Sequence, residues 1–219
     1  MAEEKAARHH DPAVRLLDWL KTRQRQVTWA AVAVVGVITA IWFVTTYQRN
    51  KEHAAIGALE SARTAALSGN LPLAASDLSR VVATYRGTLA GDEAVILLGQ
   101  VRLQQGQPDL AAQEVQAAIG RGLASQFRAQ AHGLLGTALE ELGDHGQAAQ
   151  AYENAAAEVW YDFMAAEYLN DAGRAYAASG DTSKAVALYR RVVTEFKDTQ
   201  GAAEAAVRVA ELEAAAGMS

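Results

Sequence analysis

The chain has 219 residues, of which 49 are alanine and three are proline. This composition favours helix, because alanine has the highest intrinsic helix propensity and proline the lowest. Cysteine is absent, which excludes a disulfide framework and thiolate chemistry. Residues 52–219 carry 12 Lys or Arg against 21 Asp or Glu, and a body with a net charge of −9 argues against nucleic-acid binding.

The first 26 residues are rich in charge and include one short amphipathic stretch. In residues 12–21, PAVRLLDWLK, apolar side chains are interspersed with Arg15, Asp18 and Lys21. This pattern predicts a short helix that lies on a membrane surface with its charges in water. We therefore expect residues 1–26 to form a cytoplasmic segment next to a membrane.

Residues 27–47, VTWAAVAVVGVITAIWFVTTY, contain no charged side chain. A helix of this length spans the roughly 30 Å hydrocarbon core of a bilayer. Trp29, Trp42 and Tyr47 lie near its ends, where such rings prefer the headgroup region. A buried core helix would have a polar face, and a cleavable signal peptide would have a shorter apolar run. We predict an uncleaved transmembrane helix that contacts lipid through residues 27–47.

Basic residues flank this segment unequally. Four precede it and two follow it: Arg15, Lys21, Arg23 and Arg25, then Arg49 and Lys51. Because the more basic flank usually stays in the cytoplasm, the bias predicts a cytoplasmic N-terminus and a C-terminal body on the other side of the membrane. Residues 48–54 are expected to be a linker between the span and that body.

A period of 37 residues runs through residues 55–202. Four glycines recur at this spacing, and each is followed five positions later by an alanine: Gly69, Gly106, Gly143 and Gly180, with Ala74, Ala111, Ala148 and Ala185. Glycine accepts the left-handed conformation that ends a helix, and small alanines let two helices approach closely. Asn70, Asp144 and Asp181 each follow one of these glycines and are typical caps for the next helix.

The repeat therefore predicts an all-α fold of stacked helical hairpins. With repeats beginning at residues 55, 92, 129 and 166, we expect an α-solenoid of about four hairpins. Residues 201–217, GAAEAAVRVAELEAAAG, give one more first-helix pattern and are expected to cap the last hairpin. The transmembrane helix at 27–47 is thus followed by a repeat domain at 55–217.

The small residues at positions 8, 15 and 20 of each repeat resemble the tetratricopeptide repeat, although the chain lacks that repeat's tryptophan and proline and its period exceeds the usual length of about 34 residues. The matching residues in the last three repeats are Gly99, Gly106, Ala111, Gly136, Gly143, Ala148, Gly173, Gly180 and Ala185. Together with PAVRLLDWLK and the span, they are similar to the bacterial single-span ancillary subunit family of the Sec translocon. That resemblance implies a protein of the cytoplasmic membrane whose repeat body lies in the periplasm and associates with the translocon and with periplasmic chaperones.

The sequence contains no recognisable constellation of catalytic or metal-binding residues. It has no cysteine, no His-x-x-x-His pair, no phosphate-binding loop and no nucleophile elbow. We therefore expect a protein that is not an enzyme and that takes no cofactor, metal or small-molecule substrate.

Two groups of residues are candidates for binding a protein partner. Polar residues of the first helices are expected to line the inner surface of the solenoid: Gln100, Thr137, Asn170 and Arg174. The second group lies in EVWYDFM at 158–164 and consists of Trp160, Tyr161 and Phe163. These rings either pack into the junction between repeats, which we favour, or anchor an interface, since aromatic residues dominate binding hot spots.

The leading hypothesis is a non-enzymatic, membrane-anchored scaffold or chaperone-like accessory factor that binds proteins. The alternative is a structural accessory subunit of a large cytoplasmic-membrane complex. In that case a stripe of small residues would pack the span against other spans: Ala31, Ala33, Gly36 and Ala40.

Single cysteines placed at Ala2 and Ser219 test the topology, because the natural chain has no thiol. In intact cells with a permeable outer membrane, we expect an impermeant thiol reagent to label the Ser219→Cys variant and not the Ala2→Cys variant. Both variants should react after lysis. Labelling of Ala2→Cys alone in intact cells would reverse the predicted orientation.

Overall fold

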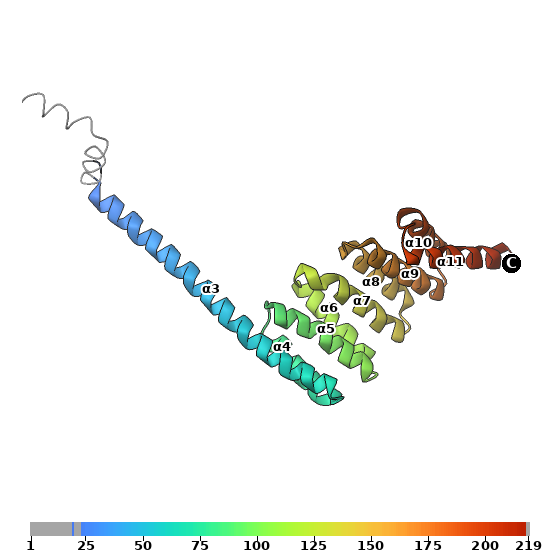
Figure 1. Ribbon diagram of the computed structural model, residues 1–219, viewed down its shortest axis with the longest axis horizontal. Coiled ribbons are helices and arrows are strands. Elements are labelled where there is room, and N and C mark those ends of the chain that lie inside the picture. Colours follow the sequence, from blue (N-terminus) through green and yellow to red (C-terminus); the bar gives the residue numbers. More distant parts are fainter. Residues whose placement is uncertain (1–18, 20–22, 218–219) are drawn as a thin grey trace, which may run out of the picture. The chain divides into compact units, whose positions relative to one another are not determined.

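The computed structural model describes residues 19 and 23–217, and these residues form helices joined by short turns (Figure 1). The helices are α3 (Gln24–Leu67), α4 (Leu71–Thr84), α5 (Leu89–Gln104), α6 (Pro108–Arg121), α7 (Ser125–Glu141), α8 (His145–Glu158), α9 (Asp162–Ala178), α10 (Thr182–Glu195) and α11 (Gln200–Gly217). Residues up to Asn50 and residues from Lys51 onward form two compact units. The amphipathic helix expected at 12–21 lies largely outside the described residues.

The N-terminal unit contains the apolar part of α3. One helical stretch within the described residues, Val32–Leu67, is long and apolar enough to cross a membrane. Hydroxyl groups in α3 bond to its own backbone: Thr28 Oγ1 donates to the Gln24 carbonyl, Thr39 Oγ1 to Val35 and Thr45 Oγ1 to Trp42, at 2.8, 2.8 and 3.0 Å. These three polar side chains therefore have partners that do not depend on water.

Residues 48–54, where we expected a linker, lie inside the unbroken helix α3. Glu52 explains why the compact repeat unit begins before residue 55. Its carboxylate accepts hydrogen bonds from the backbone N–H groups of Leu89 and Ala90, both at 2.9 Å, and so caps the start of α5. Lys51 Nζ adds a hydrogen bond of 2.6 Å to the Arg86 carbonyl. The middle of α3 is thereby bonded to the junction between the first two hairpins.

The four predicted hairpin turns are confirmed, and they share one backbone geometry. At the first turn Gly69 has φ 77°, its N–H donates to the Ala66 carbonyl, and the Asn70 N–H donates to the Ala65 carbonyl. The same pair of bonds recurs after Gly106, Gly143 and Gly180, whose φ values are 67°, 81° and 86°. This is the Schellman arrangement, in which a left-handed residue satisfies the last carbonyls of a helix.

Two of the three predicted caps are formed. The side chains of Asn70 and Asp181 accept hydrogen bonds from the backbone N–H groups of Leu73 and Lys184, at 3.3 and 3.1 Å. Asp144 stands at the corresponding position of α8 but makes no side-chain capping bond. The glycine turn is therefore the constant feature of the hairpins, and the cap varies from one repeat to the next.

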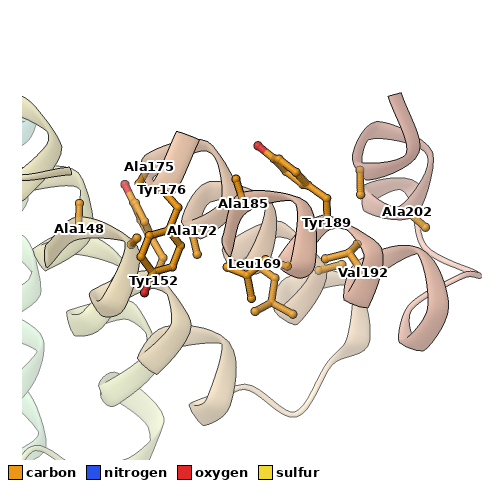
Figure 2. Packing of buried hydrophobic residues seen from close by; sticks show 14 residues of the cluster. Ala148, Tyr152, Leu169, Ala172, Ala175, Tyr176, Ala185, Tyr189, Val192 and Ala202 are labelled. Atoms are coloured by element: carbon orange, nitrogen blue, oxygen red, sulfur yellow. The ribbon is translucent and has the colours of Figure 1, made fainter. Parts of the chain in front are cut away.

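Glycine at position 8 lets the two helices of a hairpin pack closely. A Cβ atom on Gly136 would lie 2.7 Å from Cε1 of Tyr152, and one on Gly173 would lie 2.8 Å from Cε1 of Tyr189. Each tyrosine ring therefore lies flat against the backbone of the facing helix. The four repeat alanines complete this contact and are fully buried: Ala74, Ala111, Ala148 and Ala185. Figure 2 shows the buried hydrophobic cluster of this region, with Ala148, Ala185, Tyr152 and Tyr189 labelled.

The C-terminal helix α11 packs against α10 and α9, as expected for a cap on the last hairpin. Its buried residues, Ala202 and Ala205, join the cluster that contains Leu188 and Val192 of α10. The predicted all-α architecture is therefore confirmed: a long apolar N-terminal helix, stacked helix pairs and a C-terminal helix.

Two glycine substitutions in the third hairpin separate conformation from packing. Gly143 has φ 81° and no neighbour within 4 Å of an added Cβ, whereas Gly146 has equal space but is an ordinary residue of α8. We expect Gly143→Ala to cost about 1–2 kcal/mol of unfolding free energy, because alanine resists the left-handed region. Gly146→Ala should stabilise the protein by about 0.5 kcal/mol through helix propensity. Equal urea-denaturation midpoints for the two variants would contradict the turn geometry.

Candidate protein-binding surface

The structure separates the four inner-surface candidates. Thr137 and Arg174 are exposed and Gln100 is half-buried, but Asn170 is only 7 % exposed. The Nδ2 of Asn170 donates a hydrogen bond of 2.9 Å to the Gly201 carbonyl, which joins α9 to the start of α11. Asn170 is therefore a structural residue in this fold, and placing it on the binding surface was wrong.

The buried position of Asn170 had a signal in the sequence. Position 5 of the earlier repeats holds Leu59, Ile96 and Gly133, and all three are buried. Two large apolar residues at one repeat position indicate an interior site whatever residue stands there in the fourth repeat. The polar character of asparagine concealed this, because its amide finds a backbone partner within the interior.

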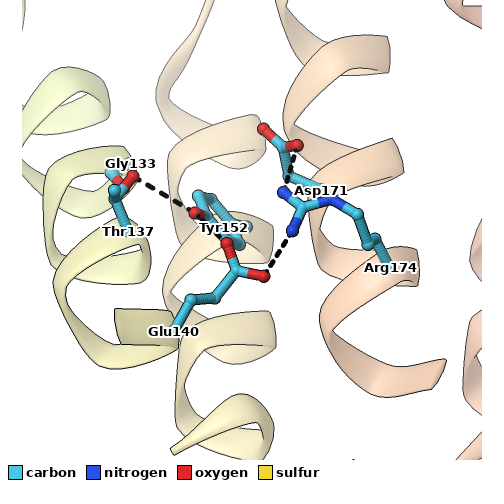
Figure 3. Close-up of polar contacts among 6 residues, drawn as sticks. All are labelled: Gly133, Thr137, Glu140, Tyr152, Asp171 and Arg174. Atoms are coloured by element: carbon cyan, nitrogen blue, oxygen red, sulfur yellow. Dashed lines mark hydrogen bonds and ion pairs between the residues drawn. The ribbon is translucent and has the colours of Figure 1, made fainter. Parts of the chain in front are cut away.

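Thr137 and Arg174 belong to one hydrogen-bonded network that the sequence analysis did not predict (Figure 3). Thr137 Oγ1 lies 3.2 Å from the hydroxyl oxygen of Tyr152, and that hydroxyl donates to Glu140 Oε2 at 2.7 Å. The Arg174 guanidinium donates to Glu140 Oε1 at 2.5 Å and to Asp171 Oδ1 at 2.8 Å. The network therefore ties α7 and α8 of the third repeat to α9 of the fourth.

Burial and neighbouring charges set the protonation of this network. Burial raises the pKa of Tyr152 well above its ordinary value, so its hydroxyl stays a neutral donor. Burial also raises the pKa of Asp171, with help from the carboxylates of Glu140 and Glu204, while Arg174 opposes that rise. Burial works against the charge of Arg174, yet its bonds to Asp171 and Glu140 outweigh burial and hold its pKa above the ordinary value. Arg174 therefore stays positively charged and is paired with Glu140 and Asp171.

The aromatic junction between α8 and α9 is exposed. Trp160, Tyr161 and Phe163 have 94, 65 and 55 % of their surfaces accessible, and the Tyr161 and Phe163 ring centroids lie 5.8 Å apart. The interpretation that we favoured, in which these rings fill the junction, is therefore wrong. Leu123 occupies the same repeat position 37 residues earlier and is only 9 % exposed, packed in the preceding core.

The backbone before each residue explains this difference. Gly122 precedes Leu123 with φ 88° and ψ 123°, in the left-handed half of conformational space. Val159 precedes Trp160 with φ −94° and ψ 149°, because a β-branched residue does not adopt the conformation of Gly122. The chain therefore leaves α6 and α8 by different routes, and the following side chain points inward in one junction and outward in the other.

Two of the exposed rings, Trp160 and Tyr161, line an open groove of about 580 Å³. Its wall and floor come from the first turns of α7, from the α8–α9 junction and from α9: Ser125, Gln126, Ala129, Gln130, Glu158, Val159, Trp160, Tyr161, Met164 and Tyr168. Close backbone contact joins α5 to α7 and α9 to α11, but α7 and α9 stay farther apart. Tyr168 bridges that gap, because a Cβ on Gly133 would lie 2.6 Å from its Cε1 atom.

The segment that builds the groove is strongly acidic. Residues 122–173 contain eight acidic residues, Glu140, Glu141, Asp144, Glu153, Glu158, Asp162, Glu167 and Asp171, against the single cation Arg128. Arg128 forms an ion pair with Glu158 at 2.9 Å. Among the residues that the structure describes, no group of three His, Asp or Glu side chains is placed to hold a metal ion. The arrangement offers apolar rings and negative charge for binding.

Comparison with known proteins agrees with this architecture. Tetratricopeptide-repeat family models match residues 96–163 and 171–199. No curated protein sequence matches the chain. Among solved structures, a Podosopora anserina putative kinesin light chain with nearly identical TPR-like repeats superimposes with a TM-score of 0.59 at 22 % identity, over 76 % of this chain and 89 % of that one. MamA superimposes with a TM-score of 0.51 at 18 % identity, over 72 % of this chain and 97 % of that one.

The chain is an all-α repeat scaffold, of a class that usually binds proteins and is usually non-catalytic. More particularly, residues 96–163 and 171–199 match tetratricopeptide repeats, and a long apolar helix lies near the N-terminus. The low identities to the solved structures show a shared fold and nothing finer. None of the matches named above is an ancillary subunit of the Sec translocon.

Two truncations at the same repeat position test the geometry of the junction. Leu123→Ala removes a buried side chain and should lower the free energy of unfolding by about 2–5 kcal/mol. Trp160→Ala removes an exposed ring and should change it by no more than about 0.5 kcal/mol. Urea denaturation followed by circular dichroism measures both. A loss for Trp160→Ala as large as that for Leu123→Ala would show that the ring is packed in solution.

Proposed function

We propose that this protein is a membrane-anchored scaffold that binds a protein partner in the groove between α7 and α9. The observation that carries this proposal is the exposure of Trp160 and Tyr161 at that groove, to 94 and 65 %, with the exposed Phe163 ring stacked beside Tyr161. Exposed apolar clusters mark interaction sites, and tryptophan and tyrosine are the commonest binding hot spots. Because Leu123 fills the equivalent position without such exposure, the repeat fold itself does not require the three rings.

Membrane anchoring through residues 27–47 is supported by the apolar helix α3. Its side chains are exposed within the structure, including Trp29, Trp42 and Phe43, and its threonine hydroxyls are bonded to the helix backbone. A tether raises the effective concentration of the repeat body near a partner in or at the same membrane, so modest contact affinity suffices. The unequal flanking charges support a bacterial cytoplasmic membrane with the N-terminus in the cytoplasm and the repeat body in the periplasm.

Two modes of action fit this scaffold. A chaperone-like accessory factor would hold its clients in the groove in weak, exchangeable complexes. A structural accessory subunit would instead be fixed in a large membrane complex, with the small residues Ala33, Gly36 and Ala40 packed against other spans. Co-purification at fixed stoichiometry favours the subunit, whereas exchange of the bound protein favours the accessory factor. Association with the Sec translocon rests on the resemblance in sequence architecture.

Partner retention by the full-length chain tests the groove. Solubilisation in a mild detergent, followed by affinity purification, recovers the partner of the natural chain. We expect the double variant Trp160→Ala and Tyr161→Ala to weaken retention by about 2 kcal/mol or more, which is roughly thirtyfold in affinity. Its melting temperature should stay close to that of the natural chain, because both rings are exposed.

Leu73→Ala is the matched control for that experiment. Leu73 is an exposed apolar residue on α4, in a different hairpin from the groove, so its truncation removes exposed apolar surface away from the proposed site. It should leave partner retention unchanged. If the natural chain and the double aromatic variant retain the partner equally well, the groove is not the binding site.

A further inference from the structure

Two carboxylates adjoin lining residues of the groove in sequence, Asp162 next to Tyr161 and Glu167 next to Tyr168, and the fold neutralises neither. Asp162 and Glu167 are exposed on α9, and within the described part of the chain neither side chain forms an ion pair or a hydrogen bond. Asp162 lies between two of the exposed rings, Tyr161 and Phe163, in the first turn of α9. Charge that is left unpaired next to an open apolar groove is available to a ligand.

The cations of this region are already occupied. Arg128 pairs with Glu158 at 2.9 Å, and Arg174 is held by both Glu140 and Asp171 at 2.5 and 2.8 Å. Glu158 itself lines the groove. A carboxylate-bearing ligand would therefore find no free guanidinium here and would meet the like charges of Asp162 and Glu167.

Nearby carboxylates also act on Tyr168, one of the aromatic residues that line the groove. Burial raises the pKa of Tyr168, and the Asp171 and Glu167 carboxylates raise it further. Tyr168 in turn lines the groove together with Trp160 and Tyr161. Aromatic faces attract guanidinium and ammonium groups, so the rings and the carboxylates favour the same kind of ligand charge.

This acidic character is local and does not extend over every cavity of the repeat body. A second cavity, of about 470 Å³, lies beside α4 and α6 in the first two hairpins. It is lined by Arg86 and Arg121 together with one acidic residue, Asp92. The two cavities therefore differ in charge: Arg86 and Arg121 line this one, whereas the charged residue that lines the α7–α9 groove is Glu158, and Asp162 and Glu167 adjoin its lining residues Tyr161 and Tyr168 in sequence.

We propose that the groove between α7 and α9 takes a peptide segment in which lysine or arginine residues flank an aromatic or aliphatic anchor. The anchor would lie against Trp160, Tyr161 and Tyr168, and the flanking cations would face Asp162 and Glu167. This inference rests on the proposed function, because it names the class of partner that the same groove binds. It gives the groove a selectivity opposite to that of a clamp built from basic residues.

Three matched peptides test this ligand class. They share one central Phe-Leu anchor and differ only in their flanks, which are lysines, glutamates or glutamines. Fluorescence anisotropy of each labelled peptide with the full-length chain in mild detergent gives the dissociation constants. We expect the lysine peptide to bind at least about tenfold more tightly than the glutamate peptide at low ionic strength, and added salt to reduce the difference.

Charge variants locate the selectivity. Glu167→Gln and Asp162→Asn should each weaken the lysine peptide by about two- to fivefold and leave the glutamine peptide unchanged, as expected for exposed ion pairs. Asp144→Asn is the control, because it removes the same charge at the hairpin turn, the opposite end of α7 from the groove. It should change none of the three affinities.

The outcomes separate this inference from the function on which it rests. The ligand class is wrong if the lysine and glutamate peptides bind equally, or if Asp144→Asn weakens binding as strongly as Glu167→Gln does. In that case Trp160→Ala should still weaken the binding of all three peptides, provided that the groove is the binding site. If Trp160→Ala leaves every peptide unaffected, the groove itself is wrong. Failure of all three peptides to bind overturns the ligand class, and partner retention by the aromatic variant then decides the function independently.

Discussion

Close approach of paired helices is the constraint on which the repeat body depends. The contact is made by backbone and small side chains, with Gly136 against the Tyr152 ring and Gly173 against the Tyr189 ring. Burial of a large ring against a bare helix removes much apolar surface from water without a bulky partner on the facing side. An alanine-rich chain can build a well-packed core in this way, because closely spaced helices leave little space between them for side chains to fill.

The same constraint explains which features the sequence predicts. Glycine at a turn acts locally, through its own backbone, so four glycines at constant spacing locate four hairpins whatever surrounds them. Small residues at fixed positions likewise specify helix pairing, because the pairing depends on their size. The all-α architecture, its hairpins and its last helix follow from these local signals.

The candidate site follows from features that no single residue reveals. Trp160 is exposed because Val159 sends the backbone along a different route from Gly122, and residue type at position 160 says nothing of that route. Asn170 is buried because its amide finds the Gly201 carbonyl in a helix that begins thirty residues later. Sequence analysis singled out the aromatic cluster but favoured the wrong environment for it, because residue types alone do not show the path of the backbone into the junction.

The gap between α7 and α9 also has a mechanical consequence. The helices α5 and α7 pack side by side, as do α9 and α11, whereas the Tyr168 ring and the Arg174 guanidinium reach from α9 to α7 across a wider gap. A side chain can change rotamer without moving its helix, so these two connections can adjust while the close packing of α8 on α9 holds the third and fourth repeats together. A segment bound in the proposed groove would contact α7 and α9 at once and would add a third connection between them.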